Sequence, residues 1–109
     1  MFRTTSQQKK ICHNCPIAKT ADLVGDSVIL IILRELTSGT KRFGDILLAL
    51  QGVSTRTLSE KLKKLEQKQI ITRIEYKEKP PRVEYQLTQK GKGLKKIVQA
   101  LFVYGEKFL

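Results

Sequence analysis

The chain has 109 residues, of which 21 are Lys or Arg and 10 are Asp or Glu, so it carries a net charge of +11 near neutral pH. With 40% hydrophobic residues it has enough apolar side chains for one core, which excludes a disordered chain and predicts a single domain. The longest purely apolar run, residues 28–33, is far shorter than the ~20 residues of a membrane-spanning helix, and the N-terminus lacks a secretory signal, so we expect a cytoplasmic protein with no membrane partner.

The first 14 residues are expected to form a flexible N-terminal arm, because most of them are polar and they show no helical periodicity. Residues 15–109 are predicted to form the folded domain. Pro16 favours the first turn of a short helix, since a proline there sacrifices no hydrogen bond, and this helix is expected to end at Gly25.

A second helix can be capped by Asp26 or Ser27. Its run at residues 28–33 is apolar on almost every face, which favours a central buried helix, with a buried strand as the alternative. Helical spacing of apolar side chains then predicts a third helix, marked by Phe43, Ile46, Leu47 and Leu50.

The fourth predicted helix follows the third after a tight turn at residues 51–53. Ser54 is a good N-cap for it, and the helix is expected to reach about Gln69. Its buried stripe is formed by Leu58, Leu62 and Leu65.

Two strands are predicted next, at residues 71–76 and 83–87, because β-branched and aromatic residues are frequent there and the second segment alternates with period two. Two prolines between them suit an extended hairpin tip. Thr88 is expected to cap one final helix. Apolar residues cover about half of its surface, more than a small domain can bury, so a second copy of the chain is predicted to cover Leu94, Ile97, Val98, Leu101, Phe102, Tyr104 and Phe108.

This element order predicts an α+β, mostly helical fold, a winged helix-turn-helix with N- and C-terminal dimerisation helices. The basic charge is concentrated in it, because residues 54–96 hold 13 basic and 5 acidic side chains. A solvated charged helix face is the ordinary alternative, but a second basic cluster on the projecting hairpin favours binding to double-stranded DNA.

The predicted DNA contacts divide into three groups. Base edges in the major groove are assigned to the first turns of the fourth helix, at Ser54, Thr55, Arg56, Thr57 and Ser59. Phosphate contacts are assigned to Lys63 and Lys64 further along the helix. The hairpin tip contributes Lys77, Lys79 and Arg82, which can reach phosphates or a minor groove.

Over residues 15–108 the sequence resembles the HxlR-type winged-helix transcriptional regulators, a group of MarR-like proteins of bacteria and archaea. The resemblance is carried by Cys15-Pro16, Gly25 with the apolar run after it, Lys41-Arg42-Phe43, the segment 52–66, the segment 80–88, Gly91, and Tyr104-Gly105-Glu106. It implies a homodimer that binds a palindromic operator and regulates transcription. The sequence departs from the pattern after Gly25, where the family often has Gly-Lys-Trp, and at Gln69, where a helix-ending glycine is expected.

Cys12 and Cys15 flank the single histidine, His13. One chain offers at most these three ligands, too few for a structural zinc site, and a permanent disulfide is disfavoured in a reducing compartment. The third interpretation is a redox sensor, in which Cys15 at a helix N-terminus is a reactive thiolate and Cys12 resolves its oxidised form. The resemblance supports this, because some HxlR-type regulators sense oxidants or electrophiles at the position of Cys15.

No catalytic constellation is present, so we do not expect an enzyme, and no cofactor is implied. The competing function is a nonspecific nucleic-acid-binding protein, either architectural or RNA-binding, that uses the same basic surfaces for phosphates only. A small-molecule effector is a further possibility, but the sequence does not identify one.

Overall fold

Six helices and three strands make up residues 15–109, the part of the chain described in this computed structural model. The helices are α2 (Pro16–Val24), α3 (Ser27–Thr37), α4 (Phe43–Ala49), α5 (Thr55–Gln67), α6 (Gln89–Lys92) and α7 (Lys95–Phe108). The strands are β1 (Lys41–Arg42), β2 (Ile71–Tyr76) and β3 (Arg82–Leu87). The predicted arm at residues 1–14, with Cys12 and His13, lies outside the described residues.

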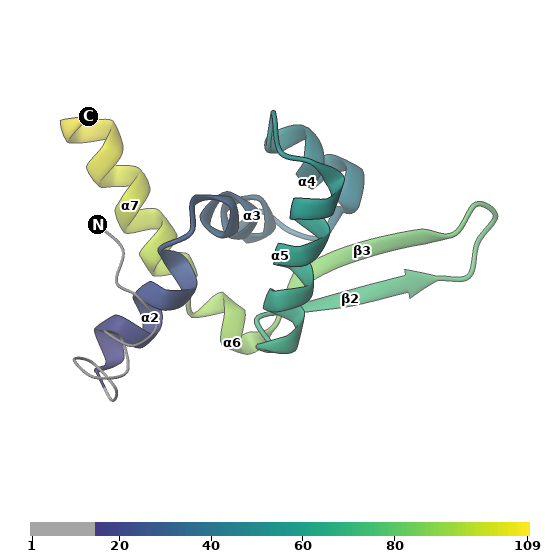
Figure 1. The fold of residues 1–109 in the computed structure, drawn as a ribbon, viewed down its shortest axis with the longest axis horizontal. Coiled ribbons are helices and arrows are strands. Elements are labelled where there is room, and N and C mark those ends of the chain that lie inside the picture. Colours follow the sequence, from purple (N-terminus) through teal and green to yellow (C-terminus); the bar gives the residue numbers. More distant parts are fainter. Residues whose placement is uncertain (1–14) are drawn as a thin grey trace.

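Helix α3 is the centre of the molecule, and α2, α4, α5, α7 and β3 all contact it (Figure 1). Its four buried side chains are Ile29, Ile32, Leu33 and Leu36. The predicted buried helix is therefore confirmed, and the strand alternative is wrong. Of the two candidate caps, Asp26 is the one used, because its carboxylate accepts hydrogen bonds from the backbone N–H groups of Val28 and Ile29 at 2.9 and 3.2 Å.

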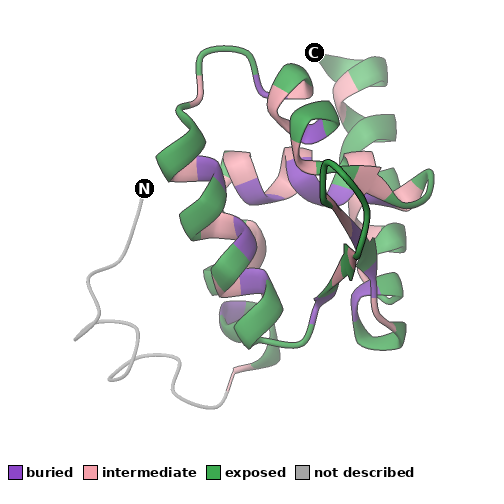
Figure 2. Cartoon of the chain, turned by 90° about the vertical axis from the view of Figure 1, so that its right-hand side faces the viewer, coloured by how far each residue is buried: buried purple, intermediate pink, exposed green. Residues whose placement is uncertain are grey.

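Helices α4 and α5 form the helix-turn-helix. Gly52 in the turn has φ of +88°, a conformation that glycine adopts without the steric cost other residues meet. Ser54 caps α5 by accepting a hydrogen bond from the N–H of Thr57 at 3.1 Å. The predicted stripe is buried, since Leu58, Leu62 and Leu65 are at most 2% exposed. One face of α5 therefore belongs to the core, and its opposite face is left for solvent or a partner (Figure 2).

Helix α5 ends at a left-handed residue that is not glycine. Gln69 has φ of +62°, and the N–H of Ile70 bonds the carbonyl of Leu65 at 2.9 Å while the N–H of Gln69 bonds that of Glu66 at 3.0 Å. This is the Schellman arrangement that the family pattern would fill with glycine. The Thr88 hydroxyl donates to the carbonyl of Gln69 at 2.6 Å, so tertiary contacts hold the strained residue in place.

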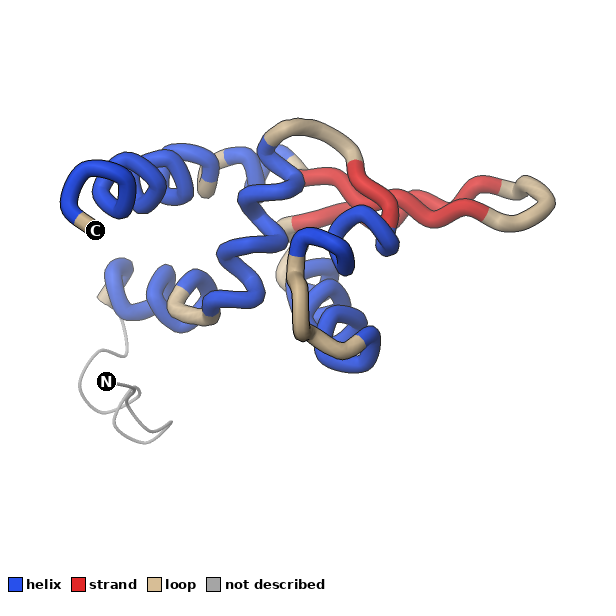
Figure 3. Tube along the Cα trace, turned by 90° about the horizontal axis from the view of Figure 1, so that it is seen from above, coloured by secondary structure: helices blue, strands red, loops and turns tan. Residues whose placement is uncertain are grey.

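The sheet has the order β1-β3-β2, and all pairs are antiparallel (Figure 3). Strands β2 and β3 pair along their full length, from Ile71 opposite Leu87 to Tyr76 opposite Arg82. Together they form the predicted hairpin, the wing, which projects from the body. Strand β1 was not predicted, since a two-residue strand has no periodicity of its own and exists only through its pairing with β3.

The predicted single C-terminal helix is wrong in one respect, because the segment folds as two helices, α6 and α7. Thr88 caps the first as expected, accepting from the N–H of Gly91 at 3.0 Å. Gly93 and Leu94 then separate the two helices. Gly91 has no room for a side chain, since a Cβ there would lie 2.1 Å from the carbonyl oxygen of Ile70, and this close approach seats α6 against the start of β2.

Candidate nucleic-acid interface

The outward face of α5 is built as the sequence predicts. Thr55, Arg56, Ser59 and Lys63 are exposed, and Lys64 is half-buried at the side of the helix. Arg56 is the most prominent, with 89% of its side chain exposed. The face thus presents hydroxyl and cationic groups on a rigid helix, which are the groups that hydrogen-bond base edges and phosphates.

Arg56 has one partner within the helix. Its Nε lies 3.3 Å from Oε1 of Glu60, one turn further on, and both side chains are mostly exposed. A surface pair of this kind contributes little to stability and exchanges readily with water. It therefore orients the guanidinium without preventing Arg56 from turning to another acceptor.

Two of the predicted base-contacting residues are engaged in capping. The Ser54 hydroxyl accepts from the N–H of Thr57 and donates to the Thr57 hydroxyl at 3.1 Å. Thr57 is also half-buried. These two residues hold the first turn of α5 in shape, whereas the exposed side chains of Thr55, Arg56 and Ser59 take no part in the cap.

An ion pair connects α5 to the start of α3. Nζ of Lys61 lies 2.5 Å from Oδ2 of Asp26, and more than 70% of each side chain is covered. Partial burial alone would raise the pKa of Asp26, but the Lys61 ammonium and the N–H groups of Ile29 and Val28 outweigh it, so its pKa lies below the usual value. Lys61, although on α5, thus faces the scaffold and fixes the position of that helix.

The cationic side chains of the wing differ in their exposure and in their ion-pair partners. Lys77 and Lys79 at the tip are exposed and, within residues 15–109, have no ion-pair partner. Arg82 is held inside the wing, 3.3 Å from Glu78 and 3.5 Å from Glu84, with its guanidinium 4.1 Å above the Tyr76 ring. These contacts stiffen the base of the tip, and 28% of the Arg82 side chain remains exposed. The predicted DNA contact of Arg82 stays a prediction.

Strand β1 adds two cations that sequence reasoning did not assign to the interface. In the sheet, Lys41 lies opposite Tyr85 of β3 and Arg42 lies opposite Glu84. The Arg42 guanidinium also lies 3.9 Å from the Glu84 carboxylate. The signal was the Lys41-Arg42-Phe43 motif just before α4. Only the pairing with β3 reveals that it lies beside the wing, where a cavity lined by Arg42, Lys79 and Arg82 separates α4 from the tip.

The apolar face of α7 lies at the end of the molecule opposite the wing, as does α2 (Figures 1 and 3). Helix α7 has no fully buried residue. Leu94 and Val98 pack partly on the core of their own chain and Ile97 is half-buried, whereas the remaining predicted dimer residues, Leu101, Phe102, Tyr104 and Phe108, are 50–63% exposed. On α2, Ile17 is 80% exposed as well.

Cys15 is the N-cap residue of α2, half-buried, and its carbonyl accepts from the N–H of Lys19 at 3.0 Å. The position at a helix N-terminus is the one predicted for a reactive thiol. Its proposed partner Cys12 is not among the described residues. From Cys15 to the C-terminus, no cluster of three or more His, Cys, Asp or Glu side chains could hold a metal ion, and no helix is long and apolar enough to cross a membrane.

Known proteins with the same features are helix-turn-helix regulators. Residues 23–109 match the family model of the HxlR-like helix-turn-helix. An uncharacterized HTH-type transcriptional regulator of Synechocystis sp. is 42% identical over 97 residues, which cover 89% of this chain and 72% of that protein.

The solved structures of two further regulators, one oxidized and one diamide-treated, are also similar. The redox regulator HypR in its oxidized form superposes with a TM-score of 0.83 at 33% identity, covering 87% of this chain and 98% of HypR. Diamide-treated YodB from Bacillus subtilis gives a TM-score of 0.70 at 35% identity, covering 86% and 94% of the two chains.

Proposed function

The chain belongs to the HxlR-like helix-turn-helix family and is a transcriptional regulator of the helix-turn-helix type, and from this premise we propose that it binds a palindromic operator in double-stranded DNA as a homodimer. The observation that carries the proposal is the outward face of α5, whose exposed hydroxyl and cationic groups lie on the same molecule as a projecting basic wing. Helix α5 enters the major groove, where Thr55, Arg56 and Ser59 read base edges. Lys63, Lys64, Lys77 and Lys79 neutralise phosphates, which adds affinity without sequence information.

The homodimer accounts for the exposed apolar side chains of α7. A second copy related by a twofold axis would cover Leu101, Phe102, Tyr104 and Phe108, and an interface of this type uses the same patch on both subunits. Such a dimer would place two α5 helices on successive major grooves, roughly 34 Å apart. A palindromic operator follows from this symmetry.

The test is a specificity ratio. A preferred duplex is first selected from random-sequence DNA, and its affinity is compared with that of random duplexes at physiological salt. A regulator is expected to prefer the selected duplex by about 10³-fold or more. A ratio near one would instead support the alternative, a nonspecific architectural or RNA-binding protein.

Two substitutions separate the recognition of bases from the contacts with phosphates. Arg56→Ala should lower the affinity for the selected duplex by about 1–3 kcal/mol and reduce the specificity ratio, while Lys79→Ala should weaken all duplexes equally and reduce the salt slope by about 1. Lys68→Ala, at an exposed lysine beyond the far end of α5, is the control and should change neither. If Arg56→Ala weakens selected and random DNA alike, Arg56 does not read bases.

Redox control of DNA binding through Cys15 is the second part of the proposal. Its N-cap position supports it, because the positive end of the α2 dipole and the nearby Lys19 favour the thiolate. A peroxide would oxidise this thiolate to a sulfenic acid with release of water or an alcohol. A second thiolate, from Cys12 or the partner subunit, would then form a disulfide with release of water.

Gel shifts of reduced and diamide-treated protein test this part separately. Wild type should change its affinity for the selected duplex on oxidation and recover it with a thiol reductant, whereas Cys15→Ser should respond to neither treatment. Equal operator affinity of the reduced and oxidised wild type would refute the redox role and leave the DNA-binding proposal intact.

A further inference from the structure

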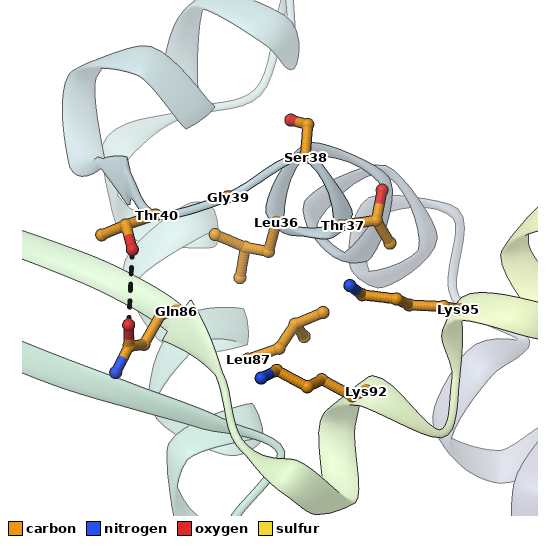
Figure 4. Close-up of a pocket in the computed structure, with 9 residues that line it drawn as sticks. All are labelled: Leu36, Thr37, Ser38, Gly39, Thr40, Gln86, Leu87, Lys92 and Lys95. Atoms are coloured by element: carbon orange, nitrogen blue, oxygen red, sulfur yellow. Dashed lines mark hydrogen bonds between the residues drawn. The ribbon is translucent and has the colours of Figure 1, made fainter.

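A cavity of about 420 Å³ lies where α7, the proposed dimerisation helix, meets the DNA-binding unit (Figure 4). The end of α3, the loop into β1, the end of β3 and the α6–α7 junction surround it. Leu36 and Leu87 supply apolar surface, and Thr40 and Gln86, hydrogen-bonded at 3.3 Å, close one side. The volume is within the range of sites for small organic molecules.

The charge of the cavity comes from Lys92 at the end of α6 and Lys95 at the start of α7. Figure 4 shows both side chains extending toward its interior. Neither ammonium group has a hydrogen bond or ion pair to any residue in the described range 15–109, and no acidic residue of that range lines the cavity. Two cations beside one concave surface repel each other, and a bound anion would relieve that repulsion.

These lysines are not needed to cap α3, whose C-terminal end borders the cavity. The carbonyls of residues 34–36 already accept hydrogen bonds from the side chains of Thr37 and Ser38, at 2.6 and 2.9 Å, and from the N–H of Gly39 at 3.3 Å. The neighbouring Lys90 shows the contrast, since its ammonium donates to a carbonyl at the end of α5, that of Lys68, at 3.0 Å. Lys90 thus serves the fold, whereas Lys92 and Lys95 have no such role.

We propose that this cavity binds a small organic dianion, a dicarboxylate or a phosphate monoester. Its two negative charges meet Lys92 and Lys95, and its carbon chain lies against Leu36 and Leu87. Because the cavity is bordered by α7 on one side and by the base of the wing on the other, a bound dianion contacts both the dimerisation helix and the DNA-binding unit. As an effector site, this inference rests on the proposed DNA-binding function; as a binding site, it does not.

Calorimetric titration of DNA-free protein at constant ionic strength tests the site directly. The probes are glutarate for the dicarboxylates and glycerol 3-phosphate for the phosphate monoesters, with the neutral glutaramide and glycerol as matched controls. At least one dianion is expected to bind about tenfold or more tightly than its neutral counterpart. The probe that binds shows whether the site takes a dicarboxylate or a phosphate monoester. If neither probe binds, the proposal is overturned.

Three matched lysine variants locate the binding. Lys92→Met and Lys95→Met should each weaken binding of the dianion by about fivefold, as expected for the loss of one partly exposed charge pair. Lys96→Met removes the same charge from an exposed position next to Lys95, outside this cavity, and should leave the affinity unchanged.

Two results would overturn the assignment. Equal weakening by all three variants would mean a general charge effect, and lower DNA affinity of Lys92→Met and Lys95→Met without dianion binding would make these lysines phosphate contacts. If the wild-type protein binds the dianion but shows no sequence-specific DNA binding, only the proposed function is refuted. The two failures are therefore distinguishable.

Discussion

Helices α3 and α7 are both rich in apolar residues, yet the molecule uses them in opposite ways. Ile29, Ile32 and Leu33 of α3 are at most 1% exposed, whereas Phe102, Tyr104 and Phe108 of α7 are 56–63% exposed. Helix α3 is surrounded by α4, α5 and the sheet, while α7 contacts mainly α3 and extends beyond it. Apolar composition therefore predicts burial, but it does not tell whether the burial occurs within one chain or between two.

The two helices also begin differently. The N–H groups at the start of α3 are capped by Asp26, which Lys61 in turn anchors to α5. The N-cap residue of α7 is Leu94, whose side chain makes no capping hydrogen bond and packs on the core instead. The region around α3 is thus complete within the chain, whereas α7 leaves an apolar face exposed, which the proposed homodimer would cover.

The largest expected effect is at the centre of α3. Ile32→Ala should lower the free energy of unfolding by about 2–5 kcal/mol, because it opens a cavity in a fully enclosed core. Urea unfolding of the diluted protein measures it, with Phe102→Ala on the exposed face of α7 as the control. Similar losses in the two variants at concentrations where the protein is monomeric would contradict the contrast between the helices.

On α7 the expected effect is on assembly rather than folding. Phe102→Glu should weaken self-association by about 2 kcal/mol or more, since it places a charge in the middle of the apolar face. Analytical ultracentrifugation gives the association constant, and circular dichroism checks that the fold is retained. Gln99→Glu adds the same charge to an exposed polar position of α7 and should leave the association unchanged. A dimer of unaltered affinity in Phe102→Glu would show that this face is not the interface.

The start of α3 is predicted to have a pH-dependent contribution. Asp26→Ala should cost about 1 kcal/mol of stability, the usual value of an N-cap, at pH 7. Because the pKa of Asp26 is lowered in the folded state, its contribution is present above the unfolded pKa of about 3.9 and is lost as the pH falls through the folded value.

Asp26→Asn is the matched control for that prediction. The amide oxygen keeps the cap but lacks the charge that Lys61 pairs with, so this variant should lose the pH dependence and retain most of the stability. Thermal unfolding between pH 3 and pH 7 measures both variants. A difference between wild type and Asp26→Asn that grows toward acid pH would have the wrong sign for a lowered pKa.

The smallest expected effect is a gain at the end of α5. Gln69→Gly should raise the free energy of unfolding by about 0.5–1 kcal/mol, because glycine adopts the left-handed conformation without a Cβ penalty. Denaturant unfolding measures it, and Gln67→Gly, in the last helical turn, should instead destabilise. A loss of stability in Gln69→Gly would mean that the side chain contributes more than its backbone strain costs.

Several features of the candidate site could be predicted because they depend on neighbours in the sequence. The spacing of Leu58, Leu62 and Leu65 fixes which face of α5 is buried, and hence that Arg56, Ser59 and Lys63 point outward. Gln69 was recognised as an unusual helix end, and the structure places it in the left-handed region.

Other features depend on residues that are distant in the sequence. The role of Arg82 could not be predicted, because Glu78, Glu84 and Tyr76 surround it only once β2 and β3 are paired. Strand β1 also needs its partner to exist. The break between α6 and α7 did have a local signal, Gly91 and Gly93, but the close approach of Gly91 to the carbonyl of Ile70, which seats α6, could not be predicted.

The sequence by itself determined the order of the four N-terminal helices and the two wing strands, the caps at Ser54 and Thr88, and the basic composition of the candidate interface, because periodicity and capping act over a few residues. Only the tertiary structure decided which charges remain available. It paired Lys61 with Asp26 and Arg82 with Glu78 and Glu84, while it left Lys92 and Lys95 facing one cavity. The physical reason is that an ion pair or a cavity requires side chains to meet in space, and local sequence does not contain the distances between them.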